Sequence, residues 1–522
     1  MPEHYSRRQL LQWVGNAGGS AALYQVSVAL GLIPAFTHSA KAEVAHLKGE
    51  KRQVVLLGAG LCNLAIAYEL EKAGFDCTFI EASGRVGGRN LTVRSGDVID
   101  EIGQPQVCEF DDEPHMYLNA GPARIPAQHH LVLGYCRELG VELEVFINEN
   151  RHALTQDDNS YGGRPLQIRE YIADSRGFMS ELLAKAVDKN VFDAEFSADD
   201  AERLQAFIRT YGDLDKNGRY KGSSRAGYAS GGMTTPSVKK GTLDFSELLK
   251  NNFWKNGMHW GEGQDQAAPL MQAVGGNDHI IKAFLPHLKA KIMLQAQVQS
   301  VAVKGKGVEI TYVKSGKLKH IAGDYCFNSI PAPIMNGIPN NFSKKYAQGI
   351  GSIGRGKLIK IAFQMKERFW ERQNIYGGIS WTNQPIEQIW YPSHGINKQK
   401  GVMLGSYAWG QSHSEWFGRM TPNERLDEAI RQGTKVHPNY GDYVENGVSI
   451  IWHRMNHQLG CTSSWSQDAR DTYFKLLQKP EGRHYMVGDQ ISYHPGWQEG
   501  ALSSAHHALH ELNKRIHAEK SG

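Results

Sequence analysis

Cysteine is scarce in this sequence, and its spacing excludes the common cysteine-based sites. Only 6 of the 522 residues are cysteine. No two of them form a CxxC pair, and none lies near a histidine at the spacing of a metal site. We therefore expect buried thiols that pack as small apolar side chains, and we expect no structural metal.

A large excess of charge of one sign is also missing. The formal net charge is only +4 and there is no long basic run, so the composition gives no reason to expect nucleic acid as a partner. No apolar run is long enough to span a membrane, and there is no internal repeat or low-complexity tract. The 41% hydrophobic and 21% charged residues are typical of a globular protein with room for two or more domains.

Residues 1–42 have the pattern of an export signal. Arg7 and Arg8 precede a moderately apolar stretch that runs to about residue 36, and Ala40-Lys41-Ala42 is a small-x-small cleavage pattern. This pattern predicts twin-arginine export, to the periplasm or out of the cell. Because that pathway carries folded proteins, it would suit a protein that binds its cofactor first. The alternative is a chance Arg-Arg pair before an amphipathic helix.

A β-α-β unit is predicted from about residue 53 onward. The apolar residues 54–57 predict a buried strand, residues 61–73 have helical periodicity, and residues 75–80 predict a second strand. Gly74 is a suitable helix stop. The unit spans roughly 30 residues, the size of one half of a dinucleotide-binding domain. We therefore expect a Rossmann-type domain here.

Two glycines lie between the first strand and the helix. Gly58 permits the tight turn, and Gly60 lets the backbone approach a pyrophosphate at the helix N-terminus. Glu81 ends the second strand, where a carboxylate can bind a ribose hydroxyl. Asn63 stands where the usual fingerprint has a third glycine, so we expect either a wider helix–strand approach or a local side-chain hydrogen bond.

The residues that follow carry a resemblance to a known family. Residues 81–89 read EASGRVGGR and resemble the E-x-x-x-R-x-G-G-R signature of FAD-containing amine oxidases. Gly88 allows close backbone approach, and Arg85 and Arg89 offer cationic groups to phosphates. Further segments are most similar to the L-amino-acid oxidases of this superfamily, and the resemblance covers roughly residues 51–512.

The resemblance implies two contacts with a substrate carboxylate. Arg124 matches the arginine that binds the carboxylate in L-amino-acid oxidases, and its planar fork suits two carboxylate oxygens. The alternative is that Arg124 binds a flavin phosphate or an internal acid. Tyr407 matches the second carboxylate contact, with a core or surface tyrosine as the alternative.

The resemblance also implies a lysine beside the flavin. Lys360 falls where the family keeps a lysine near the reactive ring nitrogen. A lysine that faces inward on an apolar strand needs a reason, because burying an unpaired ammonium is costly. The alternative is that Lys360 points to solvent and that Lys357 or Arg355 takes its role.

The remaining implied site residues lie mostly near the C-terminus. Asp489 replaces the commoner glutamate in the element that returns to the FAD. The Gly496 carbonyl would face the substrate amine, and Trp497 would wall the pocket against the flavin. Val298 is implied as a backbone contact on the adenine side. The last helix begins with backbone amides that would support the electron-rich edge of the flavin, those of Gly500, Ala501 and Leu502.

The rest of the pattern predicts a mixed α/β fold. We expect a Rossmann-type, glutathione-reductase-like FAD-binding domain and a mixed-sheet substrate-binding domain with a mostly helical insert, including helices at 169–189 and 199–208. Strands are predicted at 292–294, 298–303, 308–313, 358–365, 402–407 and 484–487, and a helix at 500–518. The expected FAD-binding parts are residues 43–125, 265–345 and 481–522, and the substrate-binding parts are 126–264 and 346–480.

The resemblance implies the oxidation of L-amino acids by FAD and oxygen, which yields 2-oxo acids, ammonia and hydrogen peroxide. The alternatives are an amine oxidase for substrates without a carboxylate, a flavin amino-acid 2-monooxygenase, and a flavoprotein without catalysis. Trp254, Trp260 and Trp497 are expected to set side-chain preference. Asp265 would meet a basic side chain or remain solvated. A homodimer is common in the family.

Overall fold

The computed structural model describes residues 41–42, 44, 51–188 and 197–521. The chain divides into two units, Met1–Ala42 and Glu43–Gly522. Nearly all of the predicted export signal lies outside the described residues, so export remains a prediction. Everything below concerns the second unit. In its described part, no helix is long and apolar enough to cross a membrane, and no group of three or more His, Cys, Asp or Glu residues is arranged to hold a metal ion.

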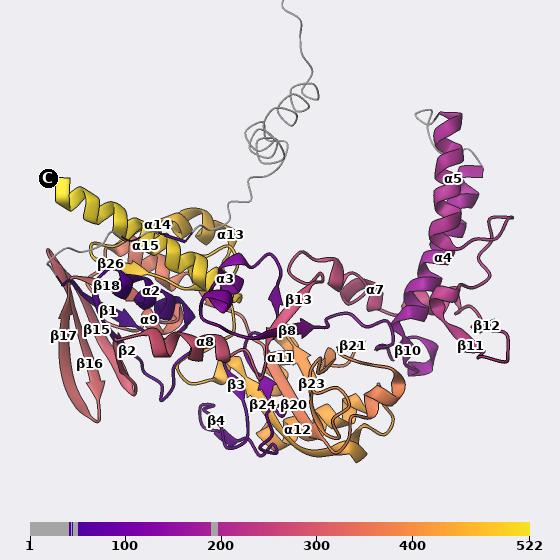
Figure 1. Ribbon diagram of the computed structural model, residues 1–522, viewed down its shortest axis with the longest axis horizontal. Helices are drawn as coiled ribbons and strands as arrows, with labels where there is room; N and C mark the ends of the chain where they lie inside the picture. Colours follow the sequence, from indigo (N-terminus) through magenta and orange to yellow (C-terminus); the bar gives the residue numbers. More distant parts are fainter. Residues whose placement is uncertain (1–40, 43, 45–50, 189–196, 522) are drawn as a thin grey trace, which may run out of the picture. The chain divides into compact units, whose positions relative to one another are not determined.

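A five-stranded parallel sheet forms the first layer of the fold. Its strand order is β14-β2-β1-β18-β26, and every neighbouring pair is parallel. The strands are β14 (Lys291–Met293), β2 (Asp76–Ile80), β1 (Gln53–Leu57), β18 (Tyr325–Asn328) and β26 (His484–Met486). Helices α2 (Leu61–Lys72) and α15 (Gln498–Ser521) pack against each other beside it (Figure 1). The expected Rossmann-type unit is therefore confirmed, with strands drawn from distant stretches of chain.

A three-stranded antiparallel sheet adjoins the parallel sheet. It contains β15 (Ala296–Lys304), β16 (Gly307–Lys314) and β17 (Lys317–Gly323) in sequence order. Apolar residues alternate with polar ones along β16, and the apolar side joins a core that β1 and β18 share. Ser315 and Gly316, both at positive φ, make the tight turn between the last two strands. The first residues of β15 lie close to the end of β2.

A seven-stranded sheet forms the second layer, with the order β10-β9-β21-β22-β23-β20-β24. Its strands are β10 (Leu166–Gln167), β9 (Leu154–Gln156), β21 (Gly378–Thr382), β22 (Gln388–Tyr391), β23 (Gly401–Ala408), β20 (Ile359–Met365) and β24 (Val444–Ile451). All seven residues of β20 are buried, and α12 (Pro422–Gly433) packs on β20, β23 and β24. This sheet holds a large apolar core of its own.

The expected helical insert is present but is not only helical. Helices α4 (Ile168–Asp188) and α5 (Ala198–Gly212) pack side by side in Figure 1, and the expected helix end at residue 189 lies outside the described residues. The same segment also contributes β8 (Leu143–Phe146), which pairs with β13 (Leu270–Ala273). Its strands β9 and β10 join the seven-stranded sheet. These short strands form because distant segments supply their hydrogen-bond partners, which local periodicity does not reveal.

Candidate active site

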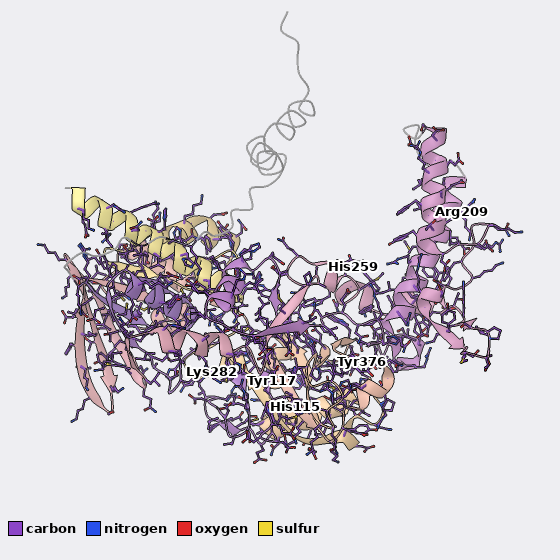
Figure 2. All side chains as sticks on the ribbon, viewed as in Figure 1. His115, Tyr117, Arg209, His259, Lys282 and Tyr376 are labelled. Atoms are coloured by element: carbon purple, nitrogen blue, oxygen red, sulfur yellow. The ribbon has the colours of Figure 1, made fainter. Side chains whose placement is uncertain are left out.

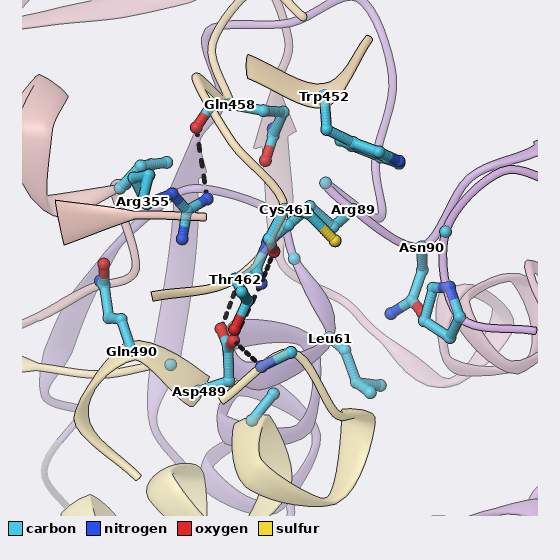
Figure 3. Close-up of a pocket in the computed structure, with 18 of the residues that line it drawn as sticks. Leu61, Arg89, Asn90, Arg355, Trp452, Gln458, Cys461, Thr462, Asp489 and Gln490 are labelled. Atoms are coloured by element: carbon cyan, nitrogen blue, oxygen red, sulfur yellow. Dashed lines mark hydrogen bonds and ion pairs between the residues drawn. The ribbon is translucent and has the colours of Figure 1, made fainter. Parts of the chain in front are cut away.

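A cavity of about 570 Å³ extends between the two layers. The glycine turn after β1 and the end of β2 line one part of it, together with Val298. Lys360 on β20 and Tyr407 on β23 line another part, with Arg124. The loop residues 452–462 and the segment 488–501 contribute further walls (Figure 3). Most of the predicted site residues therefore meet at one cavity.

The turn after β1 has the geometry expected for a dinucleotide. Gly58 has a φ of +89°, and Gly60 begins α2 without any side-chain cap. A Cβ at Gly60 would point into open space at the cavity wall. The buried carboxylate of Glu81 accepts hydrogen bonds from the Ala59 and Ser83 amides at 2.7 and 2.8 Å. The helix N-terminus and the acid at the strand end thus flank a cavity that a pyrophosphate and ribose would fit.

Asn63 makes the local hydrogen bonds that the sequence allowed for. Its side-chain amide donates to the carbonyls of Leu57 and Gly58 at 3.0 and 2.8 Å. It also lies 3.2 Å from the Ser329 hydroxyl, which follows β18. A glycine would leave these acceptors without this donor. Asn63 therefore fastens the helix to the ends of two strands.

The two arginines of the 81–89 signature have different surroundings. Arg85 does not line the cavity, and its guanidinium donates to the carbonyls of Val86 and Gly88 at 3.3 and 2.7 Å. Arg89 lines the cavity and forms an ion pair with Asp489, and it also donates to the Cys461 carbonyl at 2.6 Å (Figure 3). Phosphate binding by either arginine stays a prediction.

The Asp489 carboxylate binds groups of the protein itself. Besides Arg89, it accepts a hydrogen bond from the Gly496 amide at 2.7 Å. Although burial opposes its charge, Arg89 holds the pKa of the Asp489 carboxyl below its usual range. The shorter acid thus positions Arg89 and the loop that carries Gly496.

The first turn of α15 meets the cavity only in part. Ala501 lines the cavity, but Gly500 and Leu502 do not. Leu502 is fully buried in the protein core, and a Cβ at Gly500 would meet the His494 carbonyl at 2.1 Å. Contacts from the Gly500 and Leu502 backbone amides to a cofactor therefore stay a prediction.

Arg124 is buried among aromatic rings at the cavity wall. Its guanidinium carbon lies 5.0 Å from the Trp390 ring, 5.4 Å from Trp497 and 5.8 Å from Trp260. The guanidinium donates from Nε and Nη2 to the amide oxygen of Gln266. No ion pair of Arg124 with an internal acid occurs in the described part of the chain, although the Asp265 carboxylate attracts its charge from a distance.

Tyr407 and Lys360 lie opposite each other on adjacent strands. They are register partners in the β20–β23 ladder, and the Lys360 ammonium is 5.4 Å from the Tyr407 ring. The Tyr407 hydroxyl also interacts with Arg124. Burial raises the pKa of Tyr407 to about 12, so its hydroxyl remains a hydrogen-bond donor at neutral pH. Sheet pairing therefore brings Lys360 and Tyr407 together, and Arg124 joins them from a loop outside this sheet.

Lys360 faces inward rather than to solvent. Its Nζ donates to the carbonyls of Asn119 and Gly121 at 2.8 and 2.7 Å. Burial and, to a lesser extent, the charge of Arg124 lower the pKa of Lys360 to about 7. Lys357 also lines the cavity but forms an ion pair with Glu415. Of the alternatives left open by the sequence, Lys360 is thus the buried amine at the wall.

Some of the residues predicted for the C-terminal wall and for substrate specificity line the cavity, and others do not. Gly496 and Trp497 line the cavity, and the Trp497 ring packs edge-on against His129 at 5.0 Å. Trp260 also lines it, but Trp254 does not and is half-exposed. Asp265 is absent from the wall, because His129 holds its carboxylate at 3.2 Å. Asp265 is therefore placed neither to meet a substrate side chain nor simply to be solvated.

Sequence reasoning missed several residues of the cavity wall: Asn90, Gln266, Trp409, Trp452 and Cys461. Five of the six cysteines are buried as expected, whereas Cys461 is half-buried and lines this wall. Trp452 directly follows the all-buried end of β24, and its indole donates to the Ala120 carbonyl at 3.0 Å. No local motif marks these residues, and the strand that Trp452 follows was not among those predicted from the sequence.

The chemistry of the wall fits a flavin dinucleotide. One end offers a helix N-terminus and an acid, and the other offers apolar and aromatic surface with buried cations. Arg355 lines the wall, and its Nε and Nη1 atoms are buried without a partner in the described part of the chain. Burial lowers the pKa of Arg355 to about 10, so it remains a cation that a bound anionic or polar group would satisfy.

Comparison with known proteins agrees with this chemistry. The family described as flavin containing amine oxidoreductase matches residues 64–509. An L-amino-acid oxidase of Siganus canaliculatus is 24% identical over 473 residues, 88% of this chain and 85% of the relative. An L-amino-acid oxidase of Pseudechis australis is 25% identical over 482 residues, 88% and 87% of the two chains.

Solved structures share the fold at lower identity. Putrescine oxidase bound to putrescine has a TM-score of 0.57 at 17% identity, covering 90% of this chain and 99% of that one. Cyclohexylamine oxidase from Brevibacterium oxydans has a TM-score of 0.59 at 14% identity, covering 91% and 100%. Both similarities concern the fold and agree with the α/β architecture predicted from the sequence.

Proposed function

We propose that this chain, which belongs to the family of flavin-containing amine oxidoreductases, is an L-amino-acid oxidase that uses FAD. In the proposed reaction an L-amino acid, oxygen and water give a 2-oxo acid, ammonia and hydrogen peroxide. FAD is preferred over a mononucleotide because the glycine turn and Glu81 form the strand–helix arrangement that binds dinucleotides. Relatives named L-amino-acid oxidase support the choice of substrate.

The proposal rests on one observation, the buried positive charge of Arg124. The guanidinium is buried, and its partners at the cavity are neutral, Gln266 and the Tyr407 hydroxyl. The Asp265 carboxylate attracts this charge but forms no ion pair with it. A buried cation without a directly paired acid is costly, whereas a carboxylate that binds it bidentately recovers much of that cost. A substrate with a carboxylate would therefore complete this site, and a simple amine would leave the charge unpaired.

Each residue then has a defined task. Arg124 and Tyr407 would hold the carboxylate, and the rings of Trp260 and Trp497 would exclude water from the reacting carbon. FAD, when bound, supplies the two-electron acceptor for the Cα hydrogen and returns the electrons to oxygen. Lys360, fixed by two carbonyls, would hold a water at the wall. The amine would bind near Gly496 in its neutral form, and no dedicated protein base is then required.

The test replaces the proposed clamp. We expect Arg124→Met to lower kcat/KM for phenylalanine about 100-fold or more, which corresponds to about 2.8 kcal/mol, while kcat/KM for phenethylamine stays within about 3-fold. Peroxide release measures both rates. Arg209→Met, an exposed arginine on α5 (Figure 2), is the matched control and should change neither rate.

Three outcomes would reject the proposal. The parent enzyme could oxidise phenethylamine faster than phenylalanine, which would indicate an amine oxidase. Product analysis could find an amide and carbon dioxide in place of the 2-oxo acid, which would indicate a monooxygenase. Bound flavin that no amino acid reduces without oxygen would indicate a flavoprotein without this catalysis.

A further inference from the structure

Gln266 occupies one edge of the Arg124 guanidinium. Its side-chain oxygen accepts from Nε at 2.9 Å and also from Nη2. The residue lies at the cavity wall, on the loop that connects α7 (Phe253–Asn256) to β13 and that His259 marks in Figure 2. No sequence motif points to it. The role argued below rests on the proposed oxidation of amino acids.

The backbone around Gln266 is held on both sides. The Gln264 carbonyl accepts from the Gln128 side chain, and the Asp265 carboxylate contacts His129 at 3.2 Å. The Gln266 carbonyl itself accepts from Asn148 at 2.9 Å. Because the loop is fastened at three consecutive residues, the position of the Gln266 amide relative to Arg124 is fixed by the fold.

This contact divides the donors of Arg124 into two sets. A guanidinium has five N–H donors. Gln266 takes the Nε donor and one Nη2 donor, which leaves three, on Nη1 and the second position of Nη2. Two of the three are enough for a bidentate carboxylate, and the Tyr407 hydroxyl is close to the same group. The plane of the fork is thus set before a substrate arrives.

We propose that Gln266 is a positioning residue that selects for carboxylated substrates, because it orients Arg124 with a neutral acceptor and leaves the guanidinium without an ion-pair partner. A neutral amide fixes the geometry without supplying a counter-charge. A glutamate of the same length would fix it equally well but would form an internal ion pair. The identity of residue 266 would therefore decide whether a substrate carboxylate is required.

The experiment gives residue 266 a negative charge and keeps its length. We expect Gln266→Glu to lower kcat/KM for phenylalanine at least 100-fold through a raised KM, because the new carboxylate competes for Arg124. For phenethylamine, kcat/KM should stay within about 3-fold, so the preference for the amino acid falls at least 30-fold. Gln264→Glu adds the same charge to an exposed position two residues away on the same loop and should leave the preference unchanged.

A second variant covers the case in which Gln266→Glu does not fold. Gln266→Met keeps the length but removes the acceptor, and we expect a roughly 10-fold higher KM for phenylalanine with kcat nearly unchanged. Benzoate titration of the oxidised holoenzyme, followed by the flavin absorbance, should show a matching 10-fold weaker Kd. A merely structural role would change kcat and the melting temperature together and would not separate the two substrates.

The outcomes distinguish this inference from the proposed function. A parent enzyme that oxidises no L-amino acid overturns the proposed function, whatever the variants do. A parent enzyme that prefers phenylalanine, with a preference unchanged in Gln266→Glu or in Gln266→Met, overturns the role of Gln266 alone.

Discussion

The protonation state of Lys360 is set by its burial. The amine lies on a strand whose residues are all buried, and two backbone carbonyls accept its hydrogens. With a pKa of about 7, roughly half of the molecules carry the neutral amine at neutral pH. The neutral amine can use its two hydrogens for the carbonyls and keep its lone pair for a water.

The titration of Lys360 should therefore be visible in the pH dependence of flavin reduction. As pH rises through about 7, we expect flavin reduction by phenylalanine to become faster, because only the neutral Lys360 amine keeps a lone pair that can bind the water at the wall. Anaerobic stopped-flow absorbance at a series of pH values measures the rate. In Lys360→Met the inflection near pH 7 should be absent and the rate about 10-fold or more lower. An unchanged inflection in that variant would assign the titration to another group.

The folded pKa of Lys360 also has a consequence for stability. Because it is lower than the unfolded value, the folded state binds fewer protons, so the stability that Lys360 contributes is present above the unfolded pKa and is lost as pH falls toward 7. Below about pH 7 this loss is complete and no longer depends on pH.

At the scale of elements, the turn from β1 into α2 depends on one amide. Asn63 sits in the first turn of α2 and is fully buried. Its hydrogen bonds join α2 to the ends of β1 and β18. A buried hydrogen-bonding group costs free energy when its partner is removed and it is left unpaired.

Asn63→Ala should loosen this turn. We expect the free energy of unfolding to fall by about 1–3 kcal/mol, and the bound flavin to dissociate more readily, since the pyrophosphate would rest on the same turn. Urea titration measures the stability, and ultrafiltration followed by flavin fluorescence measures retention. Asn217→Ala, at an exposed turn, is the control. A variant with unchanged stability and retention would show that the amide is dispensable.

At the scale of the whole molecule, a buried ion pair joins distant parts of the chain. Arg425 on α12 donates from both terminal nitrogens to Glu101, which follows β4 (Val98–Ile99), at 2.7 and 2.6 Å. Both side chains are fully buried, and 324 residues separate them. The pair thus connects the N-terminal part of the described chain to the seven-stranded sheet on which α12 packs.

Breaking this pair should be far costlier than breaking a surface pair. We expect Arg425→Met to lower the free energy of unfolding by about 3–5 kcal/mol, because it leaves the Glu101 carboxylate buried without its main counter-charge. The double variant with Glu101→Gln should recover part of this loss. Arg431→Met breaks the exposed pair with Glu428 on the same helix and should cost about 0.5 kcal/mol or less.

Thermal unfolding at matched pH compares the four proteins. Equal melting temperatures for Arg425→Met and Arg431→Met would contradict the structural importance of the buried pair. A double variant less stable than Arg425→Met would show that the unpaired carboxylate is not the cause of the loss.

Local sequence determined the β-α-β unit and the residues of the predicted dinucleotide site. The strand, glycine turn, helix and acid of residues 53–81 were predicted because each depends on neighbours within a few residues. The hydrogen bonds of Asn63 were anticipated for the same reason. The roles of Arg124, Tyr407 and Lys360 came from resemblance, since nothing in their own segments shows that they meet.

Only the tertiary structure decided which groups pair at the cavity. Gln266 reaches Arg124 across 142 residues, and Asp489 reaches Arg89 across 400. Cys461 lines the wall because a loop returns there, not because of its spacing from other cysteines. Such contacts depend on where strands pair and loops close, and a buried charge takes its partner from whatever the fold brings close. The sequence therefore determines which charges are available, whereas the packing determines which of them is left for the substrate.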